Sequence, residues 1–272
     1  MFFQPWPGHV ATPADAGLAH EDVELVAADG VRLHAWLVHP DVEPVGRVLF
    51  LHGNAQNVSY HLPAALWWVA EGYEVLALDY RGYGRSAGSP TIDGALLDVD
   101  AALGFVETRG AADGLPSHVF GQSLGASLAI LALAADPRAA GRVDALVVEA
   151  GFARFGRVAA EIASRVAFTW PLQWLPRLTL AALDDPVDAI GAVGVPTVVV
   201  HSADDRIVAI DHGRELFAAA RPPKRFVEAG GPHIGAAADP AVRAAVLEFV
   251  REASALQVPA GRSPGDAEGK RP

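Results

Sequence analysis

The sequence contains three copies of the pattern Gly-x-Ser-x-Gly, centred on Ser86, Ser123 and Ser263. In enzymes with a serine nucleophile, this pattern forms a sharp turn between a strand and a helix, which exposes the serine oxygen. The flanking glycines avoid side-chain clashes in the turn, and the start of the helix offers free N–H groups to a developing oxyanion. Because three copies are present, the motif alone does not identify the nucleophile. The structure predicted for the segments on either side of each serine must identify it.

Only Ser123 has the flanking segments that this chemistry needs. The apolar run 118–120 predicts a strand directly before it, and residues 124–135 predict a helix directly after it. Ser86 is followed by glycine, serine and proline rather than by a helix, so we interpret it as a structural loop residue. Ser263 lies near the end of the chain with no histidine after it. Ser123 is therefore the predicted nucleophile.

A serine hydroxyl needs a neighbouring imidazole as general base, and a carboxylate must orient that imidazole. Three histidines follow Ser123. His201 ends a predicted strand and precedes the candidate acids, which favours a turn or packing role. His212 begins a predicted helix and is interpreted as a capping or surface residue. His233 follows the last predicted strand in a glycine-rich loop, and we predict that it is the base.

Two aspartates compete for the role of the orienting carboxylate. Asp204 and Asp205 both follow the apolar strand predicted at 197–200. Asp205 precedes the apolar pair Ile207 and Val208, which would anchor the loop and point Asp205 inward. Asp204 is the alternative, although it also suits a turn or capping position. We therefore predict Asp205 as the acid.

The loop after the strand predicted at 47–51 should supply part of an oxyanion hole. Gly53 allows the backbone to approach a reacting carbonyl closely. We predict backbone N–H donors from Asn54, with Ala55 as the alternative, and from Leu124.

Neither a metal nor a cofactor is expected. His52 is interpreted as a brace of the oxyanion loop, and no His-Glu-x-x-His or comparable histidine spacing is present. Residues 82–87 also fit Gly-x-Gly-x-x-Ala, a dinucleotide fingerprint that would indicate an oxidoreductase. That fingerprint requires its glycines to begin a helix directly, which Gly88 and Pro90 oppose.

The remaining sequence predicts an α/β fold that would position these residues. Asp29-Gly30 between two apolar runs indicates an antiparallel hairpin. Short apolar runs then alternate with longer helical patterns, which is typical of a parallel sheet with helices on both faces. The predicted strands are 47–51, 74–78, 118–120, 145–149, 197–200 and 225–227, and the predicted helices are 62–71, 92–108, 124–135, 211–220 and 241–253.

One segment, about 152–182, interrupts this alternation and is rich in aromatic residues. We interpret it as a small helical lid whose Phe168, Trp170 and Trp174 would line an apolar acyl pocket. An ordinary crossover helix with a surface turn is the alternative. Trp67 and Trp68 in an earlier helix could also line the pocket, but core packing is the alternative for at least one of them.

The 272 residues are enough for one domain, predicted over 1–255, with a disordered tail over 256–272. The absence of cysteine excludes disulfides, thiolate metal sites and a cysteine nucleophile. A net charge of −11 argues against nucleic-acid partners. No signal peptide, membrane anchor or membrane-spanning stretch is expected, which favours a cytoplasmic location. The oligomeric state is left open.

Together these motifs resemble the α/β-hydrolase superfamily, in the branch of lysophospholipase-like, monoacylglycerol-lipase-like and depalmitoylase-like proteins. The resemblance rests on residues 51–55, 79–86, 121–125, 196–205 and 231–233. It implies an eight-stranded, mostly parallel sheet and hydrolysis of carboxylic esters or thioesters through an acyl-enzyme. Pro232 is a departure, because this branch usually has glycine before the catalytic histidine.

The sequence therefore predicts a serine hydrolase that cleaves small esters with short to medium acyl chains. A peptidase or thioesterase with the same three residues is an alternative within the same class. A non-catalytic binding protein of this fold is the alternative from another class. The complete order of serine, aspartate and histidine argues against the latter.

Overall fold

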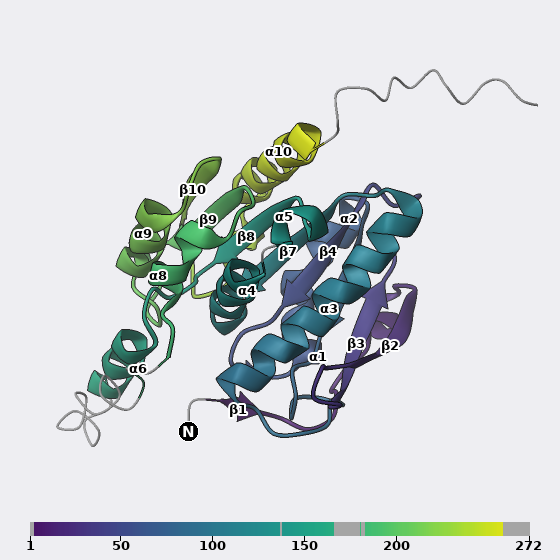
Figure 1. The fold of residues 1–272 in the computed structure, drawn as a ribbon, viewed down its shortest axis with the longest axis horizontal. Helices are drawn as coiled ribbons and strands as arrows, with labels where there is room; N and C mark the ends of the chain where they lie inside the picture. Colours follow the sequence, from purple (N-terminus) through teal and green to yellow (C-terminus); the bar gives the residue numbers. More distant parts are fainter. Residues whose placement is uncertain (1–2, 137, 166–179, 181–182, 258–272) are drawn as a thin grey trace, which may run out of the picture.

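The computed structural model describes residues 3–136, 138–165, 180 and 183–257 (Figure 1). Within these ranges, eight strands form one sheet in the order β10-β9-β8-β7-β4-β6-β3-β2. The strands are β2 (His20–Val26), β3 (Arg32–Val38), β4 (Gly46–Leu51), β6 (Tyr73–Leu78), β7 (Ser117–Gln122), β8 (Ala145–Glu149), β9 (Thr197–Ser202) and β10 (Lys224–Ala229).

The strands from β6 to β10 run parallel in the sheet, whereas β3 is antiparallel to both β6 and β2. The predicted hairpin at Asp29-Gly30 is the turn between β2 and β3, with His20 paired to Val38 at its open end. A separate two-residue pairing joins β1 (Gln4–Pro5) to β5 (Ala55–Gln56). The predicted eight-stranded, mostly parallel sheet is confirmed.

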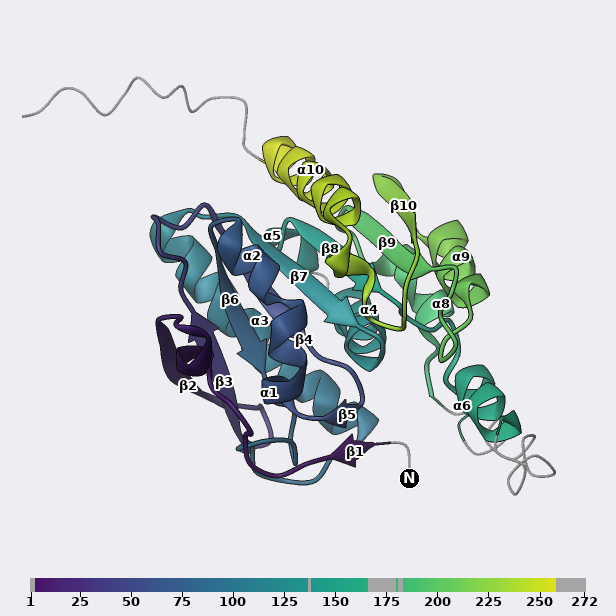
Figure 2. The same cartoon turned by 180° about the vertical axis from the view of Figure 1, so that it is seen from behind.

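Helices cover both faces of the sheet (Figures 1 and 2). One apolar core lies under α3, α4 and α9, and the other lies under α1, α2 and α10. The helices are α1 (Val58–His61), α2 (Leu66–Ala70), α3 (Ile92–Asp113), α4 (Leu124–Ala135), α5 (Ala139–Arg142), α6 (Phe155–Ser164), α8 (Pro186–Ala189), α9 (Ile210–Ala219) and α10 (Pro240–Gln257), with short 3-10 helices at Pro13–Ala16, Leu62–Ala64, Ile190–Ala192 and Ala236–Ala238.

Two predicted elements differ in their extent. The segment predicted as one helix at 62–71 consists of the 3-10 turn Leu62–Ala64 and helix α2, because Pro63 lacks the N–H that a continuous helix requires. At the C-terminal end, α10 continues to Gln257, so residues 256 and 257 are helical and do not belong to the predicted tail.

Trp67 and Trp68 contribute to the core, as the alternative interpretation proposed. Trp68 is fully buried, and its ring stacks on Trp67 with centroids 4.1 Å apart. Trp68 also contacts Tyr73 and Phe120 in the layer beneath α10. These rings therefore stabilise the fold beneath the helices.

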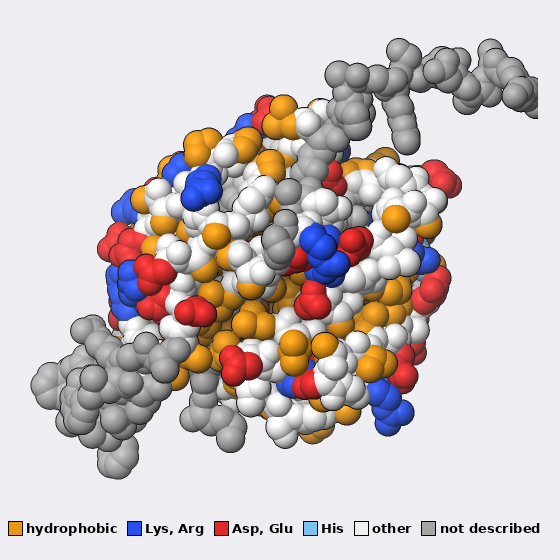
Figure 3. Space-filling model, viewed as in Figure 1, with side chains coloured by type: hydrophobic (Ala, Val, Ile, Leu, Met, Phe, Trp, Pro, Cys, Tyr) orange, Lys and Arg blue, Asp and Glu red, His pale blue; other side chains and the backbone are white. Residues whose placement is uncertain are grey.

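The charged side chains are mixed over the surface. On the face seen in Figure 3, basic side chains lie in small groups beside acidic ones. Ion pairs such as those of Arg142 with Asp100 and Asp136 account for part of this arrangement. None of the described helices is long and apolar enough to cross a membrane.

A buried histidine in the central strand β7 makes stability depend on pH. His118 is fully buried, and neither of its ring nitrogens has a hydrogen-bond partner among the described residues. Desolvation lowers its pKa to about 3. Between this value and the ordinary histidine pKa of about 6.5, the unfolded chain binds a proton that the folded chain does not. Folding stability therefore decreases as the pH falls through this interval.

We predict that His118→Leu weakens this dependence. Each pH unit in the interval costs about 1.4 kcal/mol for one such histidine, so from pH 7 to pH 5 the variant should lose about 2 kcal/mol less unfolding free energy than the wild type. Urea unfolding at both pH values measures the difference. His20→Leu, at a partly exposed histidine, is the control. An equal loss in the wild type and His118→Leu would contradict the prediction.

Candidate active site

Ser123 occupies a sharp turn between β7 and α4. Its backbone has φ 52° and ψ −112°, a left-handed conformation that is unfavourable for a residue with a side chain. The turn is held by its N–H, which donates to the carbonyl of Glu149 at 2.9 Å. Helix α4 begins at the next residue, Leu124. The structure thus has the strand, turn and helix that the sequence predicts around Ser123.

The two glycines of the motif are required by close packing. A Cβ on Gly121 would lie 2.5 Å from the Cα of Ala126, and a Cβ on Gly125 would lie 2.1 Å from the carbonyl oxygen of Leu51. Both distances are far below van der Waals contact. Gly121 therefore lets the first turn of α4 lie close to the end of β7, and Gly125 lets the same turn dock on the end of β4.

His233 and Asp205 meet at the same edge of the sheet. His233 Nδ1 donates to Asp205 Oδ2 over 2.6 Å, while the N–H groups of Ile207 and Val208 donate to Asp205 Oδ1 over 2.8 and 2.9 Å. Burial alone would raise the pKa of Asp205, but these hydrogen bonds and the charge of His233 outweigh it and hold the pKa below its usual range. Asp205 is thus an ionised carboxylate that is hydrogen-bonded to the imidazole of His233.

The loop that carries His233 rests on Glu149, which the sequence analysis did not single out. Glu149 Oε1 accepts the N–H of Ala236 at 2.9 Å, and Glu149 Oε2 accepts Gln122 Nε2 at 2.7 Å. Burial raises the pKa of Glu149 above its usual value. An acidic residue at the end of an otherwise apolar strand is the signal that could have identified it.

Four consecutive carbonyl groups of the loop after β4 are held by aromatic side chains. Tyr80 Oη donates to the carbonyl of His52 at 3.1 Å, and His52 Nδ1 donates to that of Gly53 at 2.7 Å. The carbonyls of Asn54 and Ala55 accept Tyr83 Oη at 2.6 Å and His61 Nε2 at 2.9 Å. The expectation that His52 braces this loop is therefore confirmed.

This bracing has a consequence for the N–H group of Asn54. Because the peptide bond is planar and trans, the fixed carbonyl of Gly53 turns the N–H of Asn54 to the opposite side. Burial, and secondarily the charge of His61, lowers the pKa of His52 to about 3, so the ring stays neutral near pH 7. Gly53 lies beside the turn, since a Cβ added to it would be 3.8 Å from the Cβ of Ser123.

The competing residues have structural roles. Ser86 Oγ donates to the carbonyl of Asp79 and accepts the N–H of His34. Asp204 Oδ2 accepts the N–H of Gly231 at 3.2 Å, as suits a turn residue. His201 is buried, and its Nε2 donates to the carbonyl of Val208, which agrees with the predicted packing role.

The interpretation of His212 as a capping or surface residue is wrong. His212 is fully buried, its Nδ1 accepts the N–H of Ala153, and its Nε2 lies 3.2 Å from Glu161 Oε2. Its position near the start of a predicted helix suggested an exposed side chain. In the structure, the segment that leads to α6 covers it. The predicted pocket residues Phe168, Trp170 and Trp174 lie outside the described residues.

We predict that Gly125→Ala destabilises the fold strongly. The added methyl group would meet backbone oxygens on β4, which cannot move aside, so the unfolding free energy should decrease by about 3 kcal/mol. Chemical denaturation of both proteins measures the change. Gly141→Ala, where no atom lies within 4 Å of the added carbon, is the matched control. A Gly125→Ala protein as stable as this control would refute the packing argument.

The chain is similar in sequence to known proteins. The chain is 31% identical to an uncharacterised protein of Mycobacterium tuberculosis over 85% of this chain and 78% of that protein. It is 31% identical to the α/β-hydrolase domain-containing protein WAV2 of Arabidopsis thaliana over 80% of this chain and 73% of that protein.

Among solved structures, the esterase Pf2001 of Pyrococcus furiosus has the same fold. It is 21% identical, with a TM-score of 0.76 over 93% of this chain and 97% of that chain. The family model described as serine aminopeptidase, S33, matches residues 42–190, more than half of the chain. The chain therefore belongs to this family of the α/β-hydrolase superfamily.

Proposed function

We propose that the protein is a serine hydrolase that cleaves carboxylic esters through an acyl-enzyme, with Ser123 as nucleophile, His233 as general base and Asp205 as the orienting acid. The hydrogen bond between His233 and Asp205 carries the proposal, together with the strained turn at Ser123. Gln122, just before that turn, contacts the carbonyl of Ile234, just after His233. The side chain of Asp205 is buried and also accepts two backbone N–H groups, so its carboxylate is held in place towards His233. A histidine with only a surface role would not require such a partner.

The mechanism follows from these roles. His233 takes the proton of Ser123 Oγ as that oxygen attacks the acyl carbonyl, and Asp205 stabilises the imidazolium that forms. The N–H groups of Asn54 and Leu124 donate to the oxyanion. His233 then protonates the leaving alcohol, and a water molecule attacks the acyl-enzyme by the same route. No cofactor takes part in this sequence.

The substrate class is proposed from two sources. A serine nucleophile with a neutral base cleaves esters more readily than amides, because an alkoxide is a better leaving group than an amide anion. Several proteins of the same fold are esterases by name, although the family itself is named for serine aminopeptidases. We propose short to medium acyl chains, with Phe168, Trp170 and Trp174 as pocket residues.

We predict that Ser123→Ala abolishes hydrolysis of p-nitrophenyl acetate, butyrate and octanoate. Loss of the nucleophile in a triad can lower turnover by about 10⁶-fold, so activity should fall to background while the circular dichroism spectrum is unchanged. Ser86→Ala is the control and should keep most of the activity, since Ser86 has a loop role.

Three outcomes of this experiment would redirect the proposal. Activity that survives in Ser123→Ala and disappears in Ser86→Ala would place the nucleophile elsewhere. A wild type that is inert on all three esters would favour a binding protein. Faster cleavage of amino-acid p-nitroanilides than of esters, in assays of both substrates with the wild type, would favour a peptidase.

We predict that Asp205→Asn and Asp204→Asn differ sharply in activity. Asparagine at 205 would favour the wrong tautomer of His233, which costs about 10⁴-fold in turnover in comparable triads. The carboxylate of Asp204 accepts the N–H of Gly231 in the histidine loop and, within the described residues, makes no hydrogen bond to the imidazole, so its variant should stay within about tenfold of the wild type. Steady-state hydrolysis of p-nitrophenyl butyrate measures both. A larger loss in Asp204→Asn would assign the orienting role to Asp204.

A further inference from the structure

Three side chains that are far apart in the sequence converge near the loop after β4. His9 belongs to the N-terminal segment, His34 to β3, and Asp79 follows β6. Their ligand atoms lie within 4.8 Å of one another. Asp79 Oδ2 is 2.6 Å from His9 Nε2 and 3.5 Å from His34 Nδ1, and all three side chains are at least nine-tenths buried.

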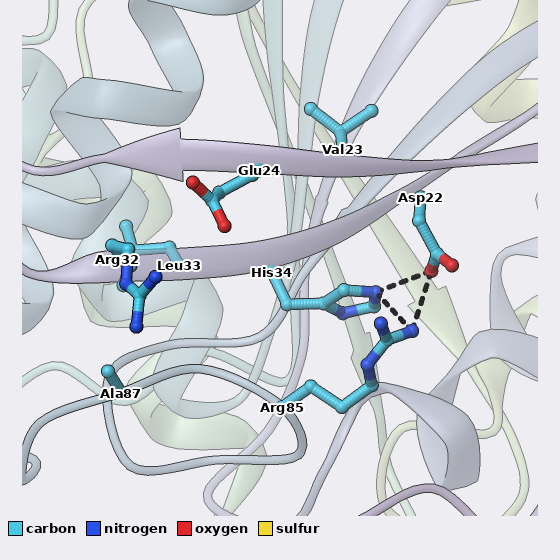
Figure 4. Close-up of a pocket in the computed structure, with 8 residues that line it drawn as sticks. All are labelled: Asp22, Val23, Glu24, Arg32, Leu33, His34, Arg85 and Ala87. Carbon is cyan, nitrogen blue, oxygen red and sulfur yellow. Dashed lines mark hydrogen bonds and ion pairs between the residues drawn. The ribbon is translucent and has the colours of Figure 1, made fainter.

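The surroundings of His34 determine where its ring carries a proton. Asp22 Oδ1 lies 2.7 Å from His34 Nε2 and also accepts Trp36 Nε1 and Arg85 Nη1 (Figure 4). Asp22 is therefore an acceptor, and the hydrogen resides on Nε2. The alternative, in which Arg85 donates to a bare Nε2 at 3.3 Å, would leave two acceptors in contact at 2.7 Å.

The ring atom of His34 that faces Asp79 is Nδ1, which lies 3.5 Å from Asp79 Oδ2. No hydrogen-bond partner for Nδ1 exists among the described residues. A buried ring nitrogen without a hydrogen-bond partner, 3.5 Å from a buried carboxylate oxygen, is the arrangement that two ligands of one bound cation would have.

We propose that His9, His34 and Asp79 form a binding site for a divalent transition-metal ion of the zinc type. Two imidazoles and one carboxylate are ligands that zinc accepts, whereas magnesium and calcium prefer oxygen ligands. In a tetrahedral zinc site with bonds of about 2.0–2.1 Å, ligand atoms are about 3.3 Å apart. The observed separations of 2.6 and 3.5 Å from Asp79 Oδ2 lie on either side of this value.

The outer contacts suit the same role. The Asp22 carboxylate that accepts His34 Nε2–H is the partner that metal-bound histidines usually have, since it fixes the tautomer and strengthens the donor nitrogen. Gly84 leaves space at the site, because a Cβ there would lie 2.0 Å from Asp79 Oδ2 and 2.6 Å from His9 Nε2. A surface cavity of about 370 Å³, whose walls include Asp22, His34 and Arg85, gives access to the ring of His34 (Figure 4).

Metal at this position would fasten the N-terminal segment to the sheet. The same segment holds the loop after β4, because Asn57 Nδ2 donates to the carbonyls of Trp6 and Gly8. Asp79 Oδ1 accepts the N–H of Val58 at the start of α1. The role proposed for the metal is therefore structural.

Zinc titration of the chelator-treated protein tests the proposal, with competition against a chromogenic chelator as the readout. The wild type should bind one Zn²⁺ per chain, and its melting temperature should rise with Zn²⁺ and not with Mg²⁺. His9→Gln and His34→Gln should each bind at least tenfold more weakly. Asp22→Asn should weaken binding by about 10- to 100-fold while it leaves the ligands in place.

His39→Gln is the matched control, since His39 also lies between two carboxylates, those of Glu21 and Glu74, outside the proposed site. It should bind zinc as the wild type does. Melting in the presence of chelator shows whether each variant is folded. The proposal is overturned if the wild type binds no stoichiometric zinc, or if folded His9→Gln and His34→Gln bind as tightly as His39→Gln does.

Discussion

The contact between the first turn of α4 and the end of β4 determines the geometry of the candidate site. Gly125 permits this contact, because any side chain there would overlap the carbonyls of Leu51 and His52. The contact forces Ser123 into a strained backbone conformation that the hydrogen bond to Glu149 helps to maintain. Packing of the α/β core thus stabilises the unfavourable backbone conformation of Ser123.

The same contact brings the loop after β4 beside Ser123, and a layer of aromatic side chains gives that loop its shape. Because His52 and its neighbours are neutral and buried, they orient backbone dipoles without competing for the charge that develops during hydrolysis. Glu149 has a comparable role beneath the histidine loop. The proposed mechanism therefore depends on buried polar residues that do not touch the substrate.

Local patterns in the sequence were enough to predict the sheet, the turn at Ser123 and the pairing of Asp205 with His233, because each depends on residues adjacent in the chain or on strand order. The burial of His212 and the approach of His9 to Asp79 depend on contacts between distant segments, which no local spacing encodes. This is why the sequence offered no sign of the proposed metal site. Glu149 went unnoticed because its partners come from other elements.

The open sheet leaves β2 and β10 as edge strands, and their composition has a consequence for self-association. Edge strands expose unpaired backbone groups that can recruit a second chain. Strand β2 carries Glu21, Asp22 and Glu24, so two copies of this edge would repel each other. Strand β10 carries Lys224, Arg225 and Glu228, and charged side chains on an edge strand discourage pairing with another chain. The charges along both margins thus oppose aggregation through like edges of the sheet.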